Sequence, residues 1–469
     1  MLQLNRREFL GALGAAAAPD ERTNVLLIIS DQFHHSVMGA AGHPVVKTPN
    51  LDRIAREGVR FDNAVCATPF CSPSRATIMT GIYPHAHGIT YNVGNPERGL
   101  DPKLGSTENT LFAAGYACAQ RGKWHLGEKA RIPAYAKDGD VEYKEGRRRE
   151  VVSTPAVKKA VEAFGDRTVI IGRTERPAPE NVITDAALEQ MRALAGKPFF
   201  LTVSLPAPHA PWAVAEPYYS MYERARIPLP ANRGFVEEAD RETPARRLGE
   251  LLGEEGLREY LGVYYGMVSM VDWNVGRLLE GLRRLNLERN TLVIFVSDHG
   301  DMQAGHMMYG KITASMFEET TRIALLMRLP GRIPAGRVVR TQAGHADLRP
   351  TILDYLGFPA PERVHGRSLR SVIDGREDLA RPMFCERERG PKNFQRVIRT
   401  LEWKYCYSSS GNSQLYDLGK DPGETRNVIG EAGAVRGRLH ATLRAWMQET
   451  GDPRAAAMEN GGMSRLSPV

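Results

Sequence analysis

Two apolar stretches that each end in an aspartate, NVLLIISD at residues 24–31 and TLVIFVSD at residues 291–298, decide the fold class of this chain. Continuous runs of Val, Ile, Leu and Phe are typical of central parallel strands, which are buried on both faces. The runs at 199–205 (FFLTVSL) and 323–329 (IALLMRL) have the same character and predict two more such strands. Because ligands of these sheets bind beyond the carboxyl ends of the strands, we expect Asp31 and Asp298 at the edge that carries the site.

Helical patterns lie between these runs, at residues 50–58, 75–82, 182–195 and 257–286. In the last of them, leucines and valines recur at helical spacing from residue 261 to residue 285. The alternation of strands and helices predicts an α/β fold with a large mixed, mostly parallel sheet flanked by helices. Residues 131–180 and 213–256 are expected to be loop insertions, because they are rich in charge or proline and show little periodicity.

The pattern changes after residue 375. Short strand-like pieces follow at 383–386, 394–400 and 403–407, and a helical pattern covers 434–449. We therefore expect a catalytic α/β domain over residues 20–375 and a small C-terminal α+β subdomain over residues 376–469.

The N-terminus resembles a twin-arginine export signal over residues 1–19, with Arg6 and Arg7 ahead of Phe-Leu and a short apolar run. This predicts a periplasmic or secreted protein. No run approaches the roughly 18 apolar residues of a membrane span, so no membrane span is expected.

Composition excludes several classes of protein. The net charge of +7, from 62 basic and 55 acidic residues among 469, is too mild to indicate nucleic-acid binding, but it fits an anionic substrate. Five cysteines, an odd number with no CxxC pair, fit neither a disulfide scaffold nor a zinc ribbon.

The most specific motif is Cys71-Ser-Pro-Ser-Arg75, which continues as ATIMTGIYP. Other motifs accompany it: TPNLD at 48–52, GKWHLG at 122–127, SDHG at 297–300 and LYDL at 415–418. With these motifs in this order, the chain resembles the formylglycine-dependent sulfatases of the alkaline phosphatase superfamily. The resemblance implies an alkaline phosphatase-like fold and a modification system that oxidises Cys71 to formylglycine.

The implied chemistry has a clear physical logic. Hydrolysis of a sulfate ester needs a nucleophile at sulfur, neutralisation of the sulfate oxygens and a proton for the departing alcohol. A hydrated aldehyde supplies two hydroxyls on one carbon: one attacks sulfur, and the other expels sulfate as the aldehyde reforms. A serine could perform only the first half of this cycle.

A divalent metal ion is also expected. The carboxylates of Asp31 and Asp298 are hard ligands suited to Ca²⁺ or Mg²⁺. The resemblance implies one ion, usually Ca²⁺, held by Asp31, Gln32, residue 71, Asp298 and His299. Many members carry Asp and Asn where this chain has Gln32 and His299. The variants found here occur in choline-sulfatase-like and phosphonate monoester hydrolase-like members. A nitrogen ligand shifts preference toward Mn²⁺, so we expect Ca²⁺ first, with Mn²⁺ or Mg²⁺ as alternatives.

The resemblance also implies a set of catalytic cations. Arg75 would stabilise the hydrated aldehyde and the metal carboxylates. Lys123 and Lys311 would bind sulfate, His125 would serve the hydroxyl that drives elimination, and His209 would lie on the leaving-group side.

Other candidates receive plainer interpretations. His85 and His87 are expected in the substrate pocket or in structural roles, and Cys66 and Cys118 as packed, reduced thiols. Structural roles are expected for Glu318, Glu319 and Arg322.

Three functions remain open on the sequence. The favoured one is a sulfuric ester hydrolase acting on a sulfated carbohydrate or another small organosulfate. The second is a phosphodiesterase or phosphonate monoester hydrolase on the same scaffold. The third is a non-catalytic, sulfated-glycan-binding relative in which Cys71 stays unmodified.

Overall fold

The structure is a computed structural model that describes residues 22–94, 99–129, 151–166, 169–311, 315–390 and 392–461. The expected export signal at 1–19 lies outside these residues. At the centre is a seven-stranded sheet with the order β11-β2-β10-β9-β1-β7-β4. Its strands are β1 (Asn24–Asp31), β2 (Val59–Phe61), β4 (Ala117–Gly122), β7 (Phe199–Pro208), β9 (Thr291–Ser297), β10 (Leu325–Arg328) and β11 (Arg337–Val339).

The sheet is mixed and mostly parallel, as expected. Strands β4, β7, β1 and β9 run parallel to one another. The run at 323–329 was expected to be parallel as well, and this was wrong: β10 pairs antiparallel with both β9 and β2. The reason is physical, because a strand covered on both faces is continuously apolar whichever way it runs.

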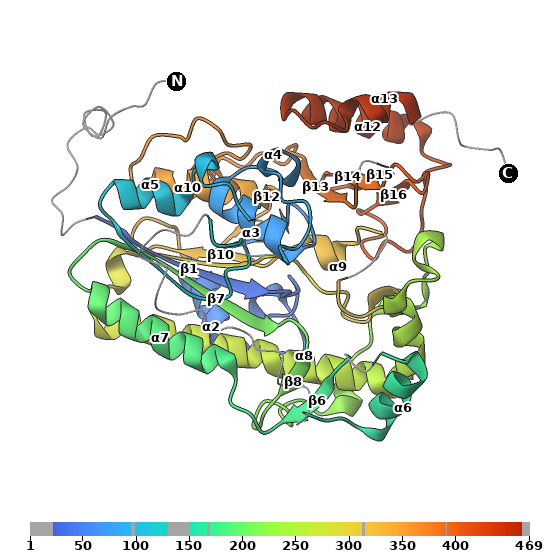
Figure 1. Ribbon diagram of the computed structural model, residues 1–469, viewed down its shortest axis with the longest axis horizontal. Helices are drawn as coiled ribbons and strands as arrows, with labels where there is room; N and C mark the ends of the chain where they lie inside the picture. Colours follow the sequence, from blue (N-terminus) through green and yellow to red (C-terminus); the bar gives the residue numbers. More distant parts are fainter. Residues whose placement is uncertain are drawn as a thin grey trace.

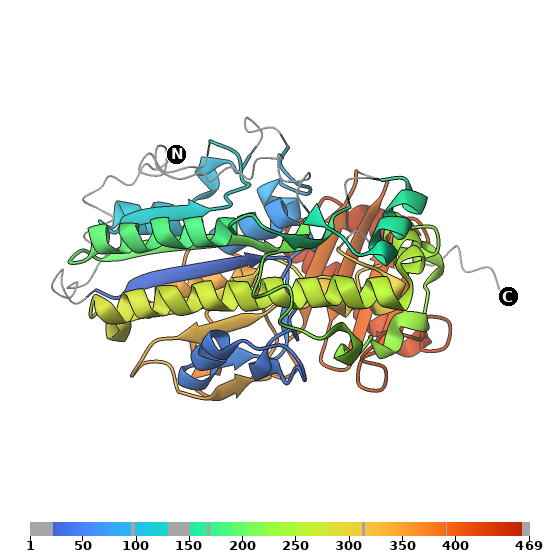
Figure 2. The ribbon, with the colours of Figure 1, turned by 90° about the horizontal axis from the view of Figure 1, so that it is seen from below.

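Helices cover both faces of the sheet (Figures 1 and 2). The helices α2 (Pro49–Glu57), α7 (Pro179–Leu194) and α8 (Pro244–Arg284) lie on one face. On the other face lie α3 (Cys71–Thr80), α5 (Thr107–Ala113) and α10 (Leu348–Tyr355). Every residue of β1, β7 and β9 is buried between these layers, which explains their unbroken apolar runs.

Three helices begin at least three residues earlier than their sequence patterns indicate: α3 at Cys71, α7 at Pro179 and α8 at Pro244. Gly253 interrupts α8 with φ 60° and ψ −170°, so the regular pattern is readable only beyond it. The two stretches expected to be loop insertions also contain regular structure, which corrects that expectation. They hold α6 (Pro155–Phe164), the small sheet of β5 (Val151–Val152), β6 (Ile171–Thr174) and β8 (Trp212–Val214), and the first turns of α8.

The C-terminal part forms a separate antiparallel sheet. Its strands are β13 (Met383–Glu388), β14 (Phe394–Arg399), β15 (Trp403–Ser408) and β16 (Gln414–Asp417). Helices α12 (Gly433–Glu449) and α13 (Ala455–Gly461) lie beside it, at the upper right of Figure 1. Leu443 and Trp446 of α12 belong to the same buried cluster as Ile398 and Tyr405 of the sheet. The expected small α+β subdomain is therefore present, and the boundary at residue 375 stays a prediction.

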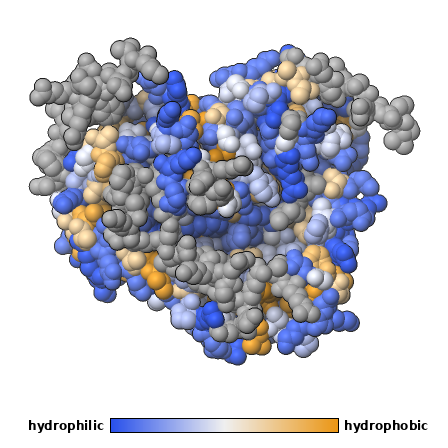
Figure 3. All heavy atoms as spheres, in the orientation of Figure 1, coloured by the Kyte–Doolittle hydropathy of each residue, from blue (hydrophilic) through white to orange (hydrophobic). Residues whose placement is uncertain are grey.

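The surface is largely hydrophilic on the face shown in Figure 3, where apolar residues are scattered among polar ones. Among the described helices, none combines the length and the apolar character needed to cross a membrane.

Candidate active site

Two aspartates meet where β1 and β9 end. These strands pair in parallel with Ser30 opposite Ser297, so Asp31 and Asp298 leave the sheet side by side. Both carboxylates are fully buried. The backbone N–H of Gln32 donates to Asp298 Oδ1 at 3.0 Å, which ties the two strand ends together.

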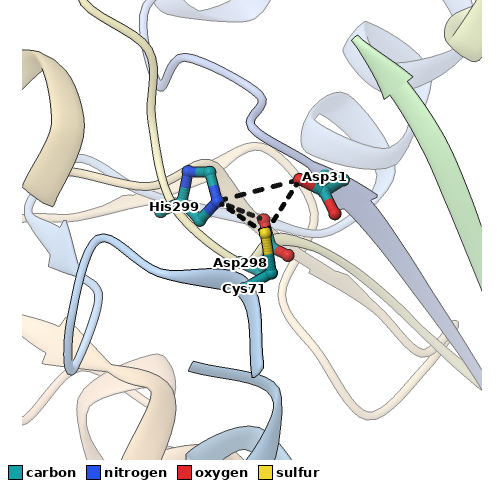
Figure 4. A group of neighbouring side chains, drawn as sticks. All are labelled: Asp31, Cys71, Asp298 and His299. Atoms are coloured by element: carbon teal, nitrogen blue, oxygen red, sulfur yellow. Dashed lines mark hydrogen bonds and ion pairs between the residues drawn. The ribbon is translucent and has the colours of Figure 1, made fainter. Parts of the chain in front are cut away.

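His299 turns one edge of its ring toward these carboxylates (Figure 4). Its Nδ1 lies 2.9 Å from the carbonyl of Gly300, so Nε2 is the atom that faces the site. This Nε2 lies 3.7 Å from Asp31 Oδ1 and 3.6 Å from Asp298 Oδ1.

The first residue of α3 completes the group. Cys71 Sγ lies 3.4 Å from His299 Nε2 and 3.6 Å from Asp31 Oδ1. The sequence starts a helix here because Pro73 occupies the first turn, where no backbone N–H is needed. The helix ends at Gly81, whose φ of 73° favours glycine. Residue 71 therefore sits at the positive end of a ten-residue helix, which suits negative charge.

These four side chains fit a divalent cation. The ligand atoms of Asp31, Cys71, Asp298 and His299 all lie within 4.8 Å of one another, and all four residues are buried. Two carboxylates and one imidazole form a donor set for a hard or borderline divalent ion. Burial and Lys311 oppose a charge on His299, yet Asp298 and Cys71 outweigh them and raise the pKa of His299. The pocket of carboxylates therefore attracts positive charge.

Arg75 lies one helical turn after Cys71 and holds both carboxylates. Its Nε donates to Asp298 Oδ2 at 2.9 Å, and its second terminal nitrogen donates to Asp31 Oδ2 at 3.2 Å. Its first terminal nitrogen donates to Ser204 Oγ at 2.6 Å and to the carbonyl of Lys123 at 2.9 Å. With 1% of its surface exposed, Arg75 is a fixed buried cation.

Two lysines flank the position of Cys71. Lys311 Nζ lies 2.8 Å from Cys71 Sγ and 3.0 Å from His299 Nε2, and Lys123 Nζ contacts Asp31 Oδ2. Burial by itself raises the pKa of a thiol, yet the surrounding cations lower the pKa of Cys71 well below its ordinary value. These are Lys123, Lys311 and His299, and a hydrogen bond with His125 adds to their effect. The site is built to stabilise negative charge at the tip of residue 71.

The two remaining histidines border the same space. His125 has a φ of 61°, and its buried Nδ1 has no hydrogen-bond partner among the described residues. Burial raises the pKa of Asp31, but Lys123, His209 and Lys311 together hold it below its usual value. His209 Nδ1 lies 2.7 Å from the carbonyl of Ala210, which leaves its Nε2 for a substrate.

The side chain of Gln32 is held by a further buried aspartate. Its amide nitrogen donates to Asp301 Oδ2 at 2.5 Å. Asp301 is fully buried and also accepts from Tyr260 and from the backbone N–H of Gln303. Sequence reasoning missed both Asp301 and Ser204. Their only signals were an aspartate two residues after His299 and a small hydroxyl residue inside an apolar strand.

Several residues singled out in the sequence lie outside this group. His87 Nε2 lies 3.2 Å from the carbonyl of Pro73 and its Nδ1 accepts from the backbone of Ile89, so it braces α3. His85 pairs with Glu386 at 2.6 Å. All five cysteines are buried and unpaired, and Glu318 forms a buried ion pair with Arg399 at 2.9 Å.

The site brings together a buried thiol at a helix N-terminus, two carboxylates with an imidazole, and converging lysine and arginine side chains. Such an arrangement can bind an anionic group and neutralise its charge. The comparisons with known proteins agree. The chain matches the Sulfatase family over residues 23–358, and the C-terminal region of N-sulphoglucosamine sulphohydrolase over residues 305–450. It therefore belongs to the sulfatase family of the alkaline phosphatase superfamily, and it is an enzyme of that family.

Individual relatives are distant but cover most of the chain. An arylsulfatase of Clostridium perfringens is 28% identical, over 87% of this chain and 90% of the relative. An N-acetylglucosamine-6-O-sulfatase of Bacteroides thetaiotaomicron is 26% identical, over 90% and 86%. The crystal structure of a phosphonate monoester hydrolase of Agrobacterium radiobacter superposes with a TM-score of 0.74, at 26% identity and over 92% and 96%.

Proposed function

We propose that this protein hydrolyses the sulfate ester of a sulfated carbohydrate or a similar small organosulfate, with residue 71 as the nucleophile after its conversion to formylglycine. The observation that carries the proposal is the convergence of Lys311, His299 and Asp31 on Cys71 Sγ, at 2.8, 3.4 and 3.6 Å. Such a site neutralises the sulfate oxygens where the nucleophile meets sulfur.

The metal and the modification each supply one part of the chemistry. A divalent ion, Ca²⁺ first and Mn²⁺ or Mg²⁺ as alternatives, would polarise a sulfate oxygen. Its ligands would be Asp31, Gln32, residue 71, Asp298 and His299. Hydrated formylglycine would provide the attacking hydroxyl and the second hydroxyl that releases sulfate. The partner implied is a formylglycine-generating system that recognises the segment from Cys71 to Arg75.

The chain's own residues bind charge and move protons. Lys123 and Lys311 hold sulfate oxygens, because both ammonium groups border the nucleophile position. Arg75 holds the two carboxylates together and would stabilise the hydrated aldehyde at residue 71. His125 takes a proton at residue 71, and His209 donates one from Nε2 to the leaving alcohol oxygen, the atom that its bond to Ala210 leaves available.

The substrate class follows from the charge of the site and from the relatives. A relative of this chain is named an N-acetylglucosamine-6-O-sulfatase, which supports a sulfated sugar. Export by the twin-arginine route would place the enzyme in the periplasm or outside the cell, where such saccharides are met.

A phosphodiesterase or phosphonate monoester hydrolase is the second candidate, favoured by Gln32 and His299 and by the superposition on a phosphonate monoester hydrolase. One experiment separates the candidates. The enzyme is produced with the modifying system, and kcat/KM is measured on 4-nitrophenyl sulfate, bis(4-nitrophenyl) phosphate and a phenylphosphonate ester.

We expect sulfate hydrolysis to dominate and peptide mass spectrometry to find formylglycine at residue 71. A higher kcat/KM on the phosphodiester would favour the second candidate. Unmodified Cys71 without turnover would favour a sulfated-glycan-binding protein.

A further inference from the structure

A cluster of two aromatic rings and two arginines lies beside the start of the nucleophile helix, and the reaction above does not use it. It consists of Phe70, Tyr91, Arg387 and Arg389, which we call the aromatic–arginine rim. The ring centroids of Phe70 and Tyr91 lie 5.0 Å apart. The guanidinium of Arg387 lies 6.0 Å from the Phe70 ring, and that of Arg389 lies 6.0 Å from the Tyr91 ring.

The backbone of the rim residues is held close to residue 71. Phe70 immediately precedes Cys71, a step of about 3.8 Å between Cα atoms. The backbone N–H of Ser72 donates to Asn92 Oδ1 at 3.2 Å, and the N–H of Val93 donates to Ser72 Oγ at 3.0 Å. The segment that carries Tyr91 is therefore held on the first turn of α3.

The two arginines come from β13 and the turn after it, in the C-terminal subdomain. Glu388 stands between them in the sequence, but alternate residues of an extended segment point to opposite sides. Glu388 pairs instead with Arg396 at 3.2 Å and with Arg454 at 2.6 Å. The acidic neighbour of the arginines is thus engaged elsewhere.

The two arginines of the rim differ in their surroundings. Burial and the nearby charge of Arg389 lower the pKa of Arg387, and Asp240 opposes this shift. Arg387 also donates to Gln395 Oε1 at 3.2 Å. In the described parts of the chain, Arg389 has no ion pair with a carboxylate. Arg389 is exposed, and Tyr91 has 47% of its surface exposed.

An exposed aromatic ring beside two like charges matches a particular kind of ligand. The apolar face of a sugar ring packs on an aromatic side chain, and a guanidinium binds a carboxylate or sulfate through two parallel hydrogen bonds. Packing alone does not require two arginines at one place, since their mutual repulsion costs free energy. A cationic alcohol such as choline would be repelled here.

Resting on the function proposed above, we propose that the aromatic–arginine rim binds the alcohol part of the substrate, and that this part is a saccharide with a second anionic group, a sulfate or a carboxylate, near the scissile sulfate. Tyr91 supports the sugar ring, and Arg387 and Arg389 bind the second anion. The preferred substrate is thereby a multiply charged saccharide.

The test uses the full-length, modified enzyme and four variants: Arg389→Ala, Arg389→Lys, Arg389→Glu and Tyr91→Ala. The matched control is Arg284→Ala, which replaces the exposed last residue of α8, an arginine that pairs with Glu280 at 2.7 Å. The probes are 4-nitrophenyl sulfate as substrate, a trisulfated heparin-type disaccharide and its fully desulfated counterpart as competitors, and choline sulfate as a substrate whose alcohol part is cationic.

For Arg389→Ala we expect the ratio of KI for the sulfated disaccharide to KM for 4-nitrophenyl sulfate to rise five- to tenfold. Arg389→Lys should restore part of the lost affinity for the sulfated disaccharide. Arg389→Glu should raise the ratio of KI to KM further, and it should also raise kcat/KM on choline sulfate. The effects should shrink in 1 M salt, where exposed charges are screened. Arg284→Ala should leave the ratio at the wild-type value.

An unchanged ratio in the rim variants, or an equal loss on all probes, would overturn the proposal and leave the rim as a packing contact between subdomains. If the wild-type enzyme does not hydrolyse 4-nitrophenyl sulfate, the proposed function fails. In that case, calorimetry measures the binding of each disaccharide to the wild-type protein and to Arg389→Ala. Binding of only the sulfated one, weakened by the substitution, supports the rim independently, and equal binding of both overturns it.

Discussion

Replacing Arg75 by Ala would expose how much of the site's stability depends on one buried cation. Arg75 is 1% exposed and donates to both Asp31 and Asp298, which are themselves fully buried. Without Arg75 the two carboxylates would face each other, with Lys123 in contact with Asp31 and His299 beside both.

The expected cost follows from this geometry. Removing one partner of a buried ion pair costs about 3–5 kcal/mol, because it leaves an uncompensated buried charge. The lost bonds to Ser204 and to the carbonyl of Lys123 add about 1 kcal/mol each. We therefore expect Arg75→Ala to lower the free energy of unfolding by about 5–7 kcal/mol.

Arg349 provides a matched control. It is also buried, at 8% exposure, and donates to the carbonyls of Thr80 and Gly105, but it forms no ion pair with a carboxylate in the described chain. Arg349→Ala should cost about 2 kcal/mol, the loss of hydrogen bonds and packing alone. The difference between the two variants isolates the charge effect.

The assay is urea unfolding followed by tryptophan fluorescence, in EDTA and in excess Ca²⁺. Since Ca²⁺ would supply the positive charge that Arg75 no longer provides, it should stabilise Arg75→Ala more than the wild type, by about 1.4 kcal/mol for each tenfold gain in affinity. Equal costs for both variants, with the same response to Ca²⁺, would refute the reasoning.

Four further predictions test other parts of the proposal. Cys71→Ser should perform one slow turnover on an activated aryl sulfate and end as a stable sulfoserine, seen as an adduct in the intact mass; sustained turnover would mean that water attacks this adduct directly. Asp298→Ala, or chelation of the metal, should abolish activity while circular dichroism stays unchanged, and full turnover by metal-free protein would contradict the metal site. Burial lowers the pKa of His87 to about 3, so the folded protein keeps this ring neutral while the unfolded chain protonates it. The free energy of unfolding should therefore fall as the pH falls from about 6.5 toward 4, by up to about 1.4 kcal/mol per pH unit for this histidine. A His87→Gln variant should lose that part of the pH dependence, and an unchanged profile would contradict it. Replacing Arg6 and Arg7 by Lys should retain the protein in the cytoplasm, as fractionation would show; unaltered export would remove the twin-arginine interpretation.

Local sequence patterns predicted much of the candidate site. The motif from Cys71 to Arg75 places a thiol and a cation one helical turn apart, and this spacing is the same wherever α3 packs. The aspartates at the ends of β1 and β9 could be predicted for a similar reason, since a polar residue after a buried apolar run marks the end of a strand. The roles of Asp301 and Ser204 could not be predicted from the sequence, because each residue acts through a contact with a residue far away in the chain.

The sequence by itself determined the α/β class, the central strands, the motif from Cys71 to Arg75 and the family resemblance, since these depend on local periodicity and on short motifs. Only the tertiary structure decided that β10 runs antiparallel, that Lys311 meets Cys71 across 240 positions, and that Arg387 and Arg389 lie over the rings of Phe70 and Tyr91. Burial fixes which residues are apolar but not the direction in which a strand runs. Contacts between distant segments arise from packing, and no local pattern in a single sequence predicts them.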